Sequence, residues 1–291
     1  MKDLYLYIME EGEGGVAATP GNIMGMGNPT PPGEGGEPGS EPMVTAKTKI
    51  HIKNKKKKRT LVESLLDDEE DLVNNEDSII EQFLKDNYNI RGTYTIKNGV
   101  VDVDGDVILK NNKLEYFTNG LFEFGKVTGL FNAGGVTSIK IKSLKGTPRI
   151  AGRFSVLRSK ITSLEGGPEI VNNDYNIYYN DYIVDLTGSP KTVNGTYNCY
   201  HCDSLKSLKG APKTIGGDFD CSECYELISL EGGPEIVGGD YNCYYCINLL
   251  SLKGVAKVIK NELTTYDCSK LNKEESEKIV KTIKVKQWLK D

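Results

Sequence analysis

Cysteine is the residue type in this chain whose spacing could hold a metal ion. The chain has 291 residues and seven cysteines. Six of these form three CxxC pairs, at positions 199 and 202, 221 and 224, and 243 and 246. Residues 203–220 separate the first two pairs, and four thiolates at such a spacing can close the tetrahedral site of a zinc ribbon. Zinc binding is therefore the first chemistry to consider.

The same cysteines also follow a 22-residue period, which favours a different interpretation. Positions 199, 221 and 243 form one column, and positions 202, 224, 246 and 268 form a second. The repeats at either end of the series place Ile177, Asn180 and Thr265 in these columns. Isoleucine cannot bind zinc, but it can replace a small core residue. We therefore expect buried free thiols in a reducing compartment, and no metal or other cofactor.

Apolar residues follow the same period over residues 161–270. One column contains Tyr175, Tyr197, Phe219, Tyr241 and Leu263. A second column, two residues further on, contains Ile177, Cys199, Cys221, Cys243 and Thr265. Residues two apart face the same side of a short strand. A fixed period of this length indicates a solenoid, in which stacked copies of one unit bury a shared core.

The repeat resembles leucine-rich repeats. Residues 219–230 read apolar–x–apolar–x–x–Cys–x–x–Leu, followed by a further leucine at 230. The resemblance covers roughly 129–270, including a shortened copy at 141–160 and a faint strand at 129–136. It implies that one polar column turns inward after the strand and satisfies backbone groups in the bend. That column contains Asn180, Cys202, Cys224, Cys246 and Cys268.

Strand positions that alternate with the core must point outward, and tyrosine is frequent there. In leucine-rich repeats this face is the usual docking surface, and tyrosine is enriched where proteins meet partners. The expected partner-binding face contains Tyr178, Tyr179, Tyr200, His201, Asp218, Asp220, Tyr244 and Tyr245. The alternative is a tyrosine ladder that stabilises only itself. On the opposite side, charges of alternating sign suit ion pairs between neighbouring repeats.

The first 59 residues have a different composition. Residues 11–46 are rich in Gly, Pro and Glu, so we expect a disordered tether. A basic block follows, which could bind a polyanion such as packaged DNA by releasing counterions; the alternative is a solvated linker. Its positive residues are Lys47, Lys49, Lys53, Lys55, Lys56, Lys57, Lys58 and Arg59. An acidic run at 67–77 nearly cancels this block, so the net charge of −5 says little about partners.

The first ten residues, MKDLYLYIME, combine aromatic and aliphatic residues with a final aliphatic–x–Glu. This segment resembles the capsid-targeting peptide of internal head proteins of T-even-like phages. The resemblance implies docking in the assembling prohead and cleavage after Glu10, with Ile8, Met9 and Glu10 as the signal. The chain departs from the pattern at Glu11, where a small residue is more usual.

The remaining segments are expected to flank the solenoid with helices. Capping-box spacing at Thr60–Glu63 and Ser78–Glu81 predicts one or two short helices within 60–98, the second with Ile79 and Leu84 on its apolar side near Tyr94. Residues 99–270 form the solenoid, and 271–291 a C-terminal capping helix that begins at a cap pair, Asn272 and Glu275. Trp288 and Leu289 are expected to fold onto the last repeat.

These features together predict a non-enzymatic phage virion protein, made in the host cytoplasm and packaged inside the capsid. Prohead components would bind its leader, and an unidentified protein would bind the repeat face; no membrane partner is expected. No HExxH, P-loop, dinucleotide or GxSxG motif occurs in the sequence. The alternatives are an intracellular leucine-rich-repeat adaptor and a virion decoration or adhesion protein.

Overall fold

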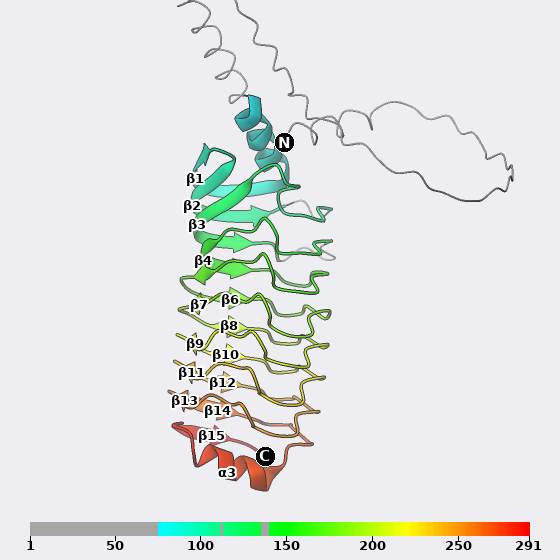
Figure 1. Ribbon diagram of the computed structural model, residues 1–291, viewed down its shortest axis with the longest axis vertical. Coiled ribbons are helices and arrows are strands. Elements are labelled where there is room, and N and C mark those ends of the chain that lie inside the picture. Colours follow the sequence, from blue (N-terminus) through cyan, green and yellow to red (C-terminus); the bar gives the residue numbers. More distant parts are fainter. Residues whose placement is uncertain (1–74, 111–112, 135–139) are drawn as a thin grey trace, which may run out of the picture. The chain divides into compact units, whose positions relative to one another are not determined.

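The computed structural model describes residues 75–110, 113–134 and 140–291. These residues form a mostly β solenoid of about eight turns, in which each coil stacks on the one before it (Figure 1). The prediction of a solenoid with 22-residue repeats is confirmed. The targeting peptide, the tether, the basic block and the first expected helix, at Thr60–Glu63, all lie outside the described residues.

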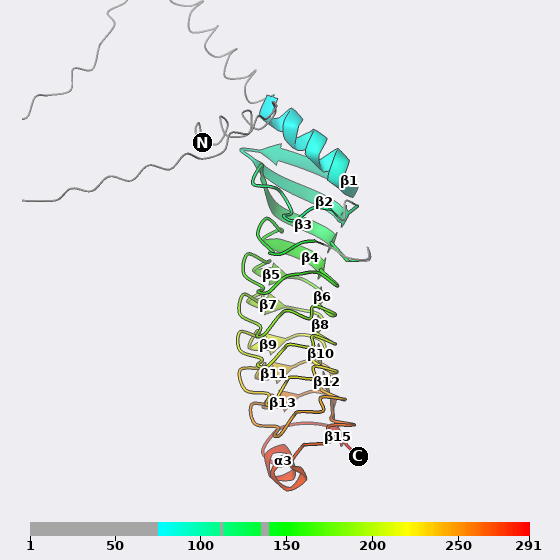
Figure 2. The ribbon, with the colours of Figure 1, turned by 90° about the vertical axis from the view of Figure 1, so that its right-hand side faces the viewer.

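Two parallel ladders of very short strands run along the stack. The first contains β5 (Ile170–Val171), β7 (Thr192–Val193), β9 (Thr214–Ile215), β11 (Ile236–Val237) and β13 (Val258–Ile259). The second contains β6 (Tyr175–Asn176), β8 (Tyr197–Asn198), β10 (Phe219–Asp220), β12 (Tyr241–Asn242) and β14 (Glu262–Thr264). β4 (Ile150–Ser155) is long enough to pair with the first strand of both ladders. Figure 2 shows the two ladders side by side.

The register explains the period seen in the sequence. Tyr175 pairs with Tyr197, and Phe219 pairs with Tyr241, so each residue lies beside its equivalent 22 positions along the chain. Every aromatic ring of this column is buried, and neighbouring ring centroids lie 5.0–5.5 Å apart. One coil could not bury these rings alone, but stacked coils cover each other.

Glycine allows neighbouring coils to approach closely at the turn before the first ladder. Gly188 has a φ of 92°, and a Cβ there would lie 2.3 Å from the backbone nitrogen of Glu165 in the previous coil. No other residue type tolerates both conditions, because an L side chain rarely adopts this φ and the neighbouring atom is backbone.

The N-terminal end of the stack consists of longer strands. β1 (Tyr88–Lys97) and β2 (Val100–Leu109) form an antiparallel pair, and β2 then pairs in parallel with β3 (Glu123–Asn132). The strand expected at 129–136 therefore begins six residues earlier, at 123. The spacing there is irregular: Val100 pairs with Glu123, 23 positions on, and Lys126 pairs with Ile150, 24 positions on.

A helix over residues 75–87 precedes β1. Ile80 and Leu84 are buried, and the Phe83 ring meets Phe122 edge-on at 5.9 Å. The expected cap at Ser78 is wrong, because the helix already includes residues 75–77. Ile79 is also exposed rather than part of the apolar side, since Ile80, Phe83 and Leu84 cover the stack.

The C-terminal end differs from the single capping helix expected over 271–291. Helix α3 (Lys273–Val280) does begin at the predicted cap, where the Asn272 side chain accepts a hydrogen bond from the Glu275 N–H. The chain then returns as a strand, β15 (Gln287–Leu289), which pairs in parallel with β14. Trp288 and Leu289 thus reach the last repeat as predicted, but as a strand of the ladder. Among the described residues, no helix is long and apolar enough to span a membrane.

Candidate functional site

The bend after each strand of the second ladder is built around an inward polar side chain. Asn180 is fully buried and donates to the carbonyls of Ile177 and Val156, at 2.7 and 2.8 Å. In the next coil the Cys202 thiol donates to the Ile177 carbonyl, at 3.4 Å. Cys224, Cys246 and Cys268 make the equivalent contact one coil further on each time, at 3.0–3.4 Å. These contacts agree with the role that the leucine-rich-repeat resemblance implied.

All seven cysteines are buried free thiols, as predicted. Burial raises the pKa of each thiol, to about 12 for Cys199 and about 11 for Cys268, so the thiols stay protonated at neutral pH. Within the described residues, one group of His, Cys, Asp or Glu ligand atoms is compact enough to share a cation, and it contains no cysteine. The three CxxC pairs occupy two fully buried columns of the repeat.

The residue that precedes each inward polar side chain has a left-handed backbone. Six consecutive coils place a non-glycine residue at this position with φ between 51° and 58°: Arg158, Tyr179, His201, Glu223, Tyr245 and Asp267. Such a conformation costs an L residue about 1–2 kcal/mol, and only Gly, Asn and Asp visit it routinely. Five of the six residues are of other types, so their large side chains are retained at an energetic cost.

We define the bend ridge by three residues in each coil. They are the left-handed residue, the residue before it and the residue two positions after it. The aromatic rings of the bend ridge contact one another from coil to coil. Arg158 lies over the Tyr179 ring at 4.8 Å, and the Tyr179 ring lies 4.6 Å from His201. Tyr200 and Tyr244 are two coils apart, yet their rings approach to 6.5 Å. Both the binding and the self-stacking interpretations are compatible with these contacts.

The predicted partner-binding face maps mainly onto this ridge. Tyr178, Tyr200 and Tyr244 alternate with buried core positions and are partly exposed, and Tyr245 is 45% exposed. Asp220 also alternates with the core, and burial raises its pKa although its carboxylate accepts the Ser222 N–H.

Asp218 has a structural role that the sequence did not indicate. Its carboxylate accepts the Asp240 N–H at 2.8 Å, one coil further on. Asp174 and Asp240 make the same link to Thr196 and Glu262. This column joins successive coils, so Asp218 is already engaged and contributes less to a docking surface than was expected.

The sequence prediction missed a second set of exposed apolar residues in the C-terminal half of the stack. Ile247 and Tyr266 are exposed on the ridge, and Ile228 and Leu250 are exposed five residues after the left-handed position of their coils. Tyr225 is partly exposed beside them in the repeat. Apart from Tyr266, each of these residues is an apolar residue at a repeat position that holds Asp or Lys in an earlier coil, as at Asp181 and Lys206.

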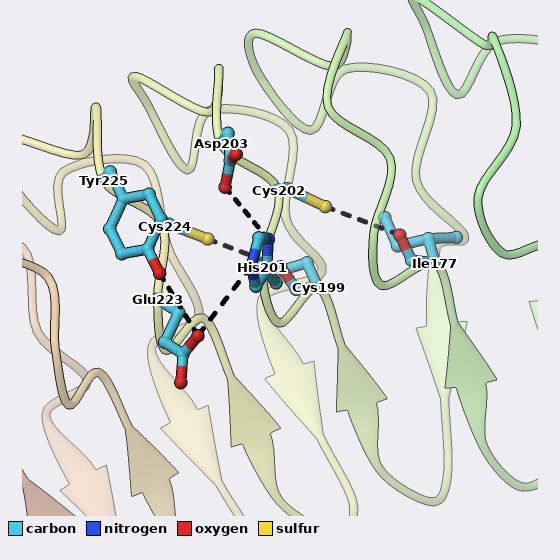
Figure 3. A network of polar contacts seen from close by, with 8 residues as sticks. All are labelled: Ile177, Cys199, His201, Cys202, Asp203, Glu223, Cys224 and Tyr225. Atoms are coloured by element: carbon cyan, nitrogen blue, oxygen red, sulfur yellow. Dashed lines mark hydrogen bonds and ion pairs between the residues drawn. The ribbon is translucent and has the colours of Figure 1, made fainter.

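Polar groups gather in the middle of the ridge (Figure 3). The His201 ring lies between two carboxylates: Nδ1 is 3.0 Å from Asp203 Oδ1, and Nε2 is 3.9 Å from Glu223 Oε2. The Tyr225 hydroxyl donates to the same Glu223 oxygen at 3.3 Å. Burial raises the pKa of Asp203, and His201 partly offsets this effect.

The opposite side of the stack shows the predicted ion pairs between coils. Glu169 contacts Arg149 and Lys191 at 2.9 and 3.0 Å, in the coils before and after it. Glu235 contacts Lys213 and Lys257 in the same way, at 3.3 and 3.0 Å. These side chains are largely exposed, so each pair stabilises the fold only slightly.

A hollow of about 1040 Å³ lies away from the ridge, near the N-terminal end of the stack. Tyr116 and residues 118–124 form one side, and Lys145, Thr147 and Arg149 form the other. Its lining contains no histidine or cysteine, and Arg149 is already paired with Glu169. We assign no chemistry to this hollow.

The remaining predicted sites lie outside the described residues. They are the processing signal, Ile8, Met9 and Glu10, and the basic block from Lys47 to Arg59. Comparison of the chain with protein-family models, with curated proteins and with solved structures finds no match. The geometry of the ridge is therefore the main basis for a functional proposal.

Proposed function

We propose that the solenoid is a non-catalytic protein-binding module that docks its partner on the bend ridge. The observation that carries this proposal is the run of left-handed non-glycine residues. Glycine or asparagine would form the same bend at a lower energetic cost, so a purely structural bend gives no reason to keep Tyr179, Glu223 and Tyr245 there.

The composition of the ridge suits a polypeptide partner. Exposed tyrosine and aliphatic side chains offer stiff contact area with little conformational entropy to lose, which is typical of interface centres. Asp181, Asp203 and Glu223 add negative charge around His201. We therefore expect the partner surface to combine apolar and basic residues, with the acidic groups guiding its approach.

Site-specific photo-crosslinking tests the docking surface in the cells that produce the protein. A photoreactive residue at position 245 should give a discrete crosslinked product. The matched control is position 236, since Tyr245 and Ile236 are 45% and 40% exposed but Ile236 lies on the first ladder. Equal products from both positions, or none from position 245, would contradict docking on the ridge.

We further propose that the chain is an internal virion protein, carried into the phage head by residues 1–10. This proposal rests on the leader resemblance and the basic block. Mass spectrometry of purified particles should find the protein starting at Glu11. An intact Met1 in particles would rule out processing, and absence from particles would favour the intracellular adaptor. Antibody access on intact particles would instead indicate a decoration or adhesion protein.

A further inference from the structure

The bend ridge brings together three side chains of the kinds that bind metal ions. Asp181 belongs to one coil, and His201 and Asp203 belong to the next. One ligand atom from each residue lies within 4.8 Å of the other two. Asp181 and Asp203 are equivalent positions in stacked coils, whose backbones lie about 4.8 Å apart. Two carboxylates at this spacing repel each other unless a positive charge lies between them.

The contact between His201 and Asp203 does not have the geometry of a simple hydrogen bond. Nδ1 and Oδ1 are 3.0 Å apart, yet neither atom has a hydrogen-bond partner and both are shielded from solvent. The two atoms are therefore close without pointing at each other. Two ligands of one cation have this relation: with bonds of about 2.0–2.2 Å, ligands at right angles lie about 3 Å apart and both point at the metal.

Glu223 lies on the side of His201 from which a carboxylate could orient a metal-bound imidazole. Its Oε2 lies 3.9 Å from His201 Nε2, on the side of the ring away from Asp203, and Tyr225 holds the same oxygen (Figure 3). A metal-bound imidazole usually directs its second N–H at a carboxylate, which fixes the tautomer and the ring orientation. The Tyr179 ring, 4.6 Å from the imidazole, also restricts its rotation.

We propose that Asp181, His201 and Asp203 bind one divalent transition-metal ion, with Glu223 orienting His201. One imidazole nitrogen and two carboxylate oxygens suit Zn²⁺ and neighbouring first-row ions. Asp181 is exposed, so solvent can complete the coordination sphere. The ion joins two coils and removes the repulsion between their carboxylates. This site does not depend on the ridge binding a protein.

Cobalt and zinc titrations of the full chain test this site. The protein is first treated with a chelator in the presence of a reductant, and Co²⁺ is then added. The expected result is one equivalent of Co²⁺ with visible absorption from nitrogen and oxygen ligands and without a thiolate charge-transfer band. Zn²⁺ should compete for the site in calorimetry and raise the melting temperature, because it binds only the folded chain.

Histidine variants provide a matched comparison, since the chain has only two histidines. His201→Ala should abolish binding, whereas His51→Ala should leave it unchanged. Glu223→Gln should weaken binding about tenfold while keeping the ligands in place. The far-ultraviolet circular dichroism of each variant confirms folding. Binding that survives His201→Ala, a thiolate band, or no binding by the wild-type chain would overturn the proposal.

Discussion

One buried amide and four buried thiols occupy the same column at the bends of this solenoid. They differ in how many hydrogen bonds they form. The Asn180 side chain donates to two carbonyls and accepts from the Ser159 N–H and hydroxyl, at 2.9 and 2.6 Å. Each thiol donates weakly to one carbonyl, as Cys224 does to Cys199. The cost of losing the polar group should therefore differ within the column.

We expect Asn180→Ala to lower the free energy of unfolding by about 2–4 kcal/mol, because it leaves several buried backbone groups without partners. Cys224→Ala removes one weak donor and a small apolar volume, and should cost about 1–2 kcal/mol. Urea denaturation under reducing conditions measures both values. Equal losses would mean that the amide contributes only its volume.

The buried thiols also predict how stability depends on pH. Burial raises the pKa of Cys199 from 9.0 to about 12, and raises that of the other six thiols as well. In the unfolded chain a thiol ionises near pH 9, whereas in the folded chain it stays protonated. The stabilisation is thus complete below pH 9 and is lost as the pH rises towards the folded pKa.

As the pH rises above 9, the free energy of unfolding falls by up to about 1.4 kcal/mol per pH unit for each such thiol. Unfolding by urea at about pH 8 and about pH 10, with reductant present, should show a marked loss at the higher pH. Cys199→Ala should show a smaller loss between these two values than the wild-type chain. A stability that is constant over this range would contradict complete burial of the thiols.

The sequence was sufficient to identify the core columns, but not the backbone of the ridge. The 22-residue period places Asn180 and Cys202 in one column, and the resemblance to leucine-rich repeats implied that this column turns inward. The left-handed residues could not be predicted in this way, because residue types such as Tyr179 and Glu223 are not typical of positive φ. The available signal was the two-residue gap between Cys199 and Cys202, which must carry the chain from one inward position to the next through a tight bend. The cluster of Asp181, His201 and Asp203, which we propose binds a metal ion, depends on the same bend and was missed for the same reason.

At the scale of elements, the interior coils were predictable and the ends were not. An interior coil is defined by its two neighbours, so its columns repeat. β1 and β15 each lack a neighbour on one side, and β2 and β3 join the antiparallel β1–β2 pair to the array, so these four strands do not follow the 22-residue period. Sequence reasoning placed Trp288 on the last repeat but assigned it to a helix. The return of the chain as a strand depends on the unpaired edge of β14, which no local pattern reveals.

The pairing of β15 with the edge strand β14 leads to a testable prediction. Trp288 donates its indole N–H to the Thr265 hydroxyl at 2.9 Å, and Lys290 lies over its ring. Trp288→Ala should cost about 2 kcal/mol, since the half-buried ring is lost. It should also free the edge of β14 for pairing with another molecule. Thermal unfolding and sedimentation would measure the two effects.

Trp288→Phe is the control for this prediction, because it keeps most of the packing and removes only the indole hydrogen bond. It should remain monodisperse to the same degree as the wild-type chain. If Trp288→Ala lowers the melting temperature but leaves the sedimentation profile unchanged, β15 remains paired with β14 without the ring, and the expected opening of the edge is wrong.

At the scale of the whole solenoid, each coil contacts mainly the coils before and after it. The backbone pairing, the aromatic column and the ion pairs all link residues 20–25 positions apart, so stability is close to a sum over neighbouring coils. One complete coil should therefore be removable. The condition is that the two coils brought into contact by the deletion carry equivalent residues at the same repeat positions.

Deletion of residues 205–226 removes one full period and should leave a folded protein. Tyr197 would then pair with Tyr241, and Lys191 would lie beside Glu235, so both the aromatic column and the alternation of charge continue. Deletion of residues 205–223 is the control, since it removes 19 residues and shifts every inward column. We expect the first variant to unfold cooperatively with a lower melting temperature, and the second to lose its β circular dichroism. If both variants behaved alike, the core would tolerate a change of register, and stacking of equivalent columns could not be what holds the coils together.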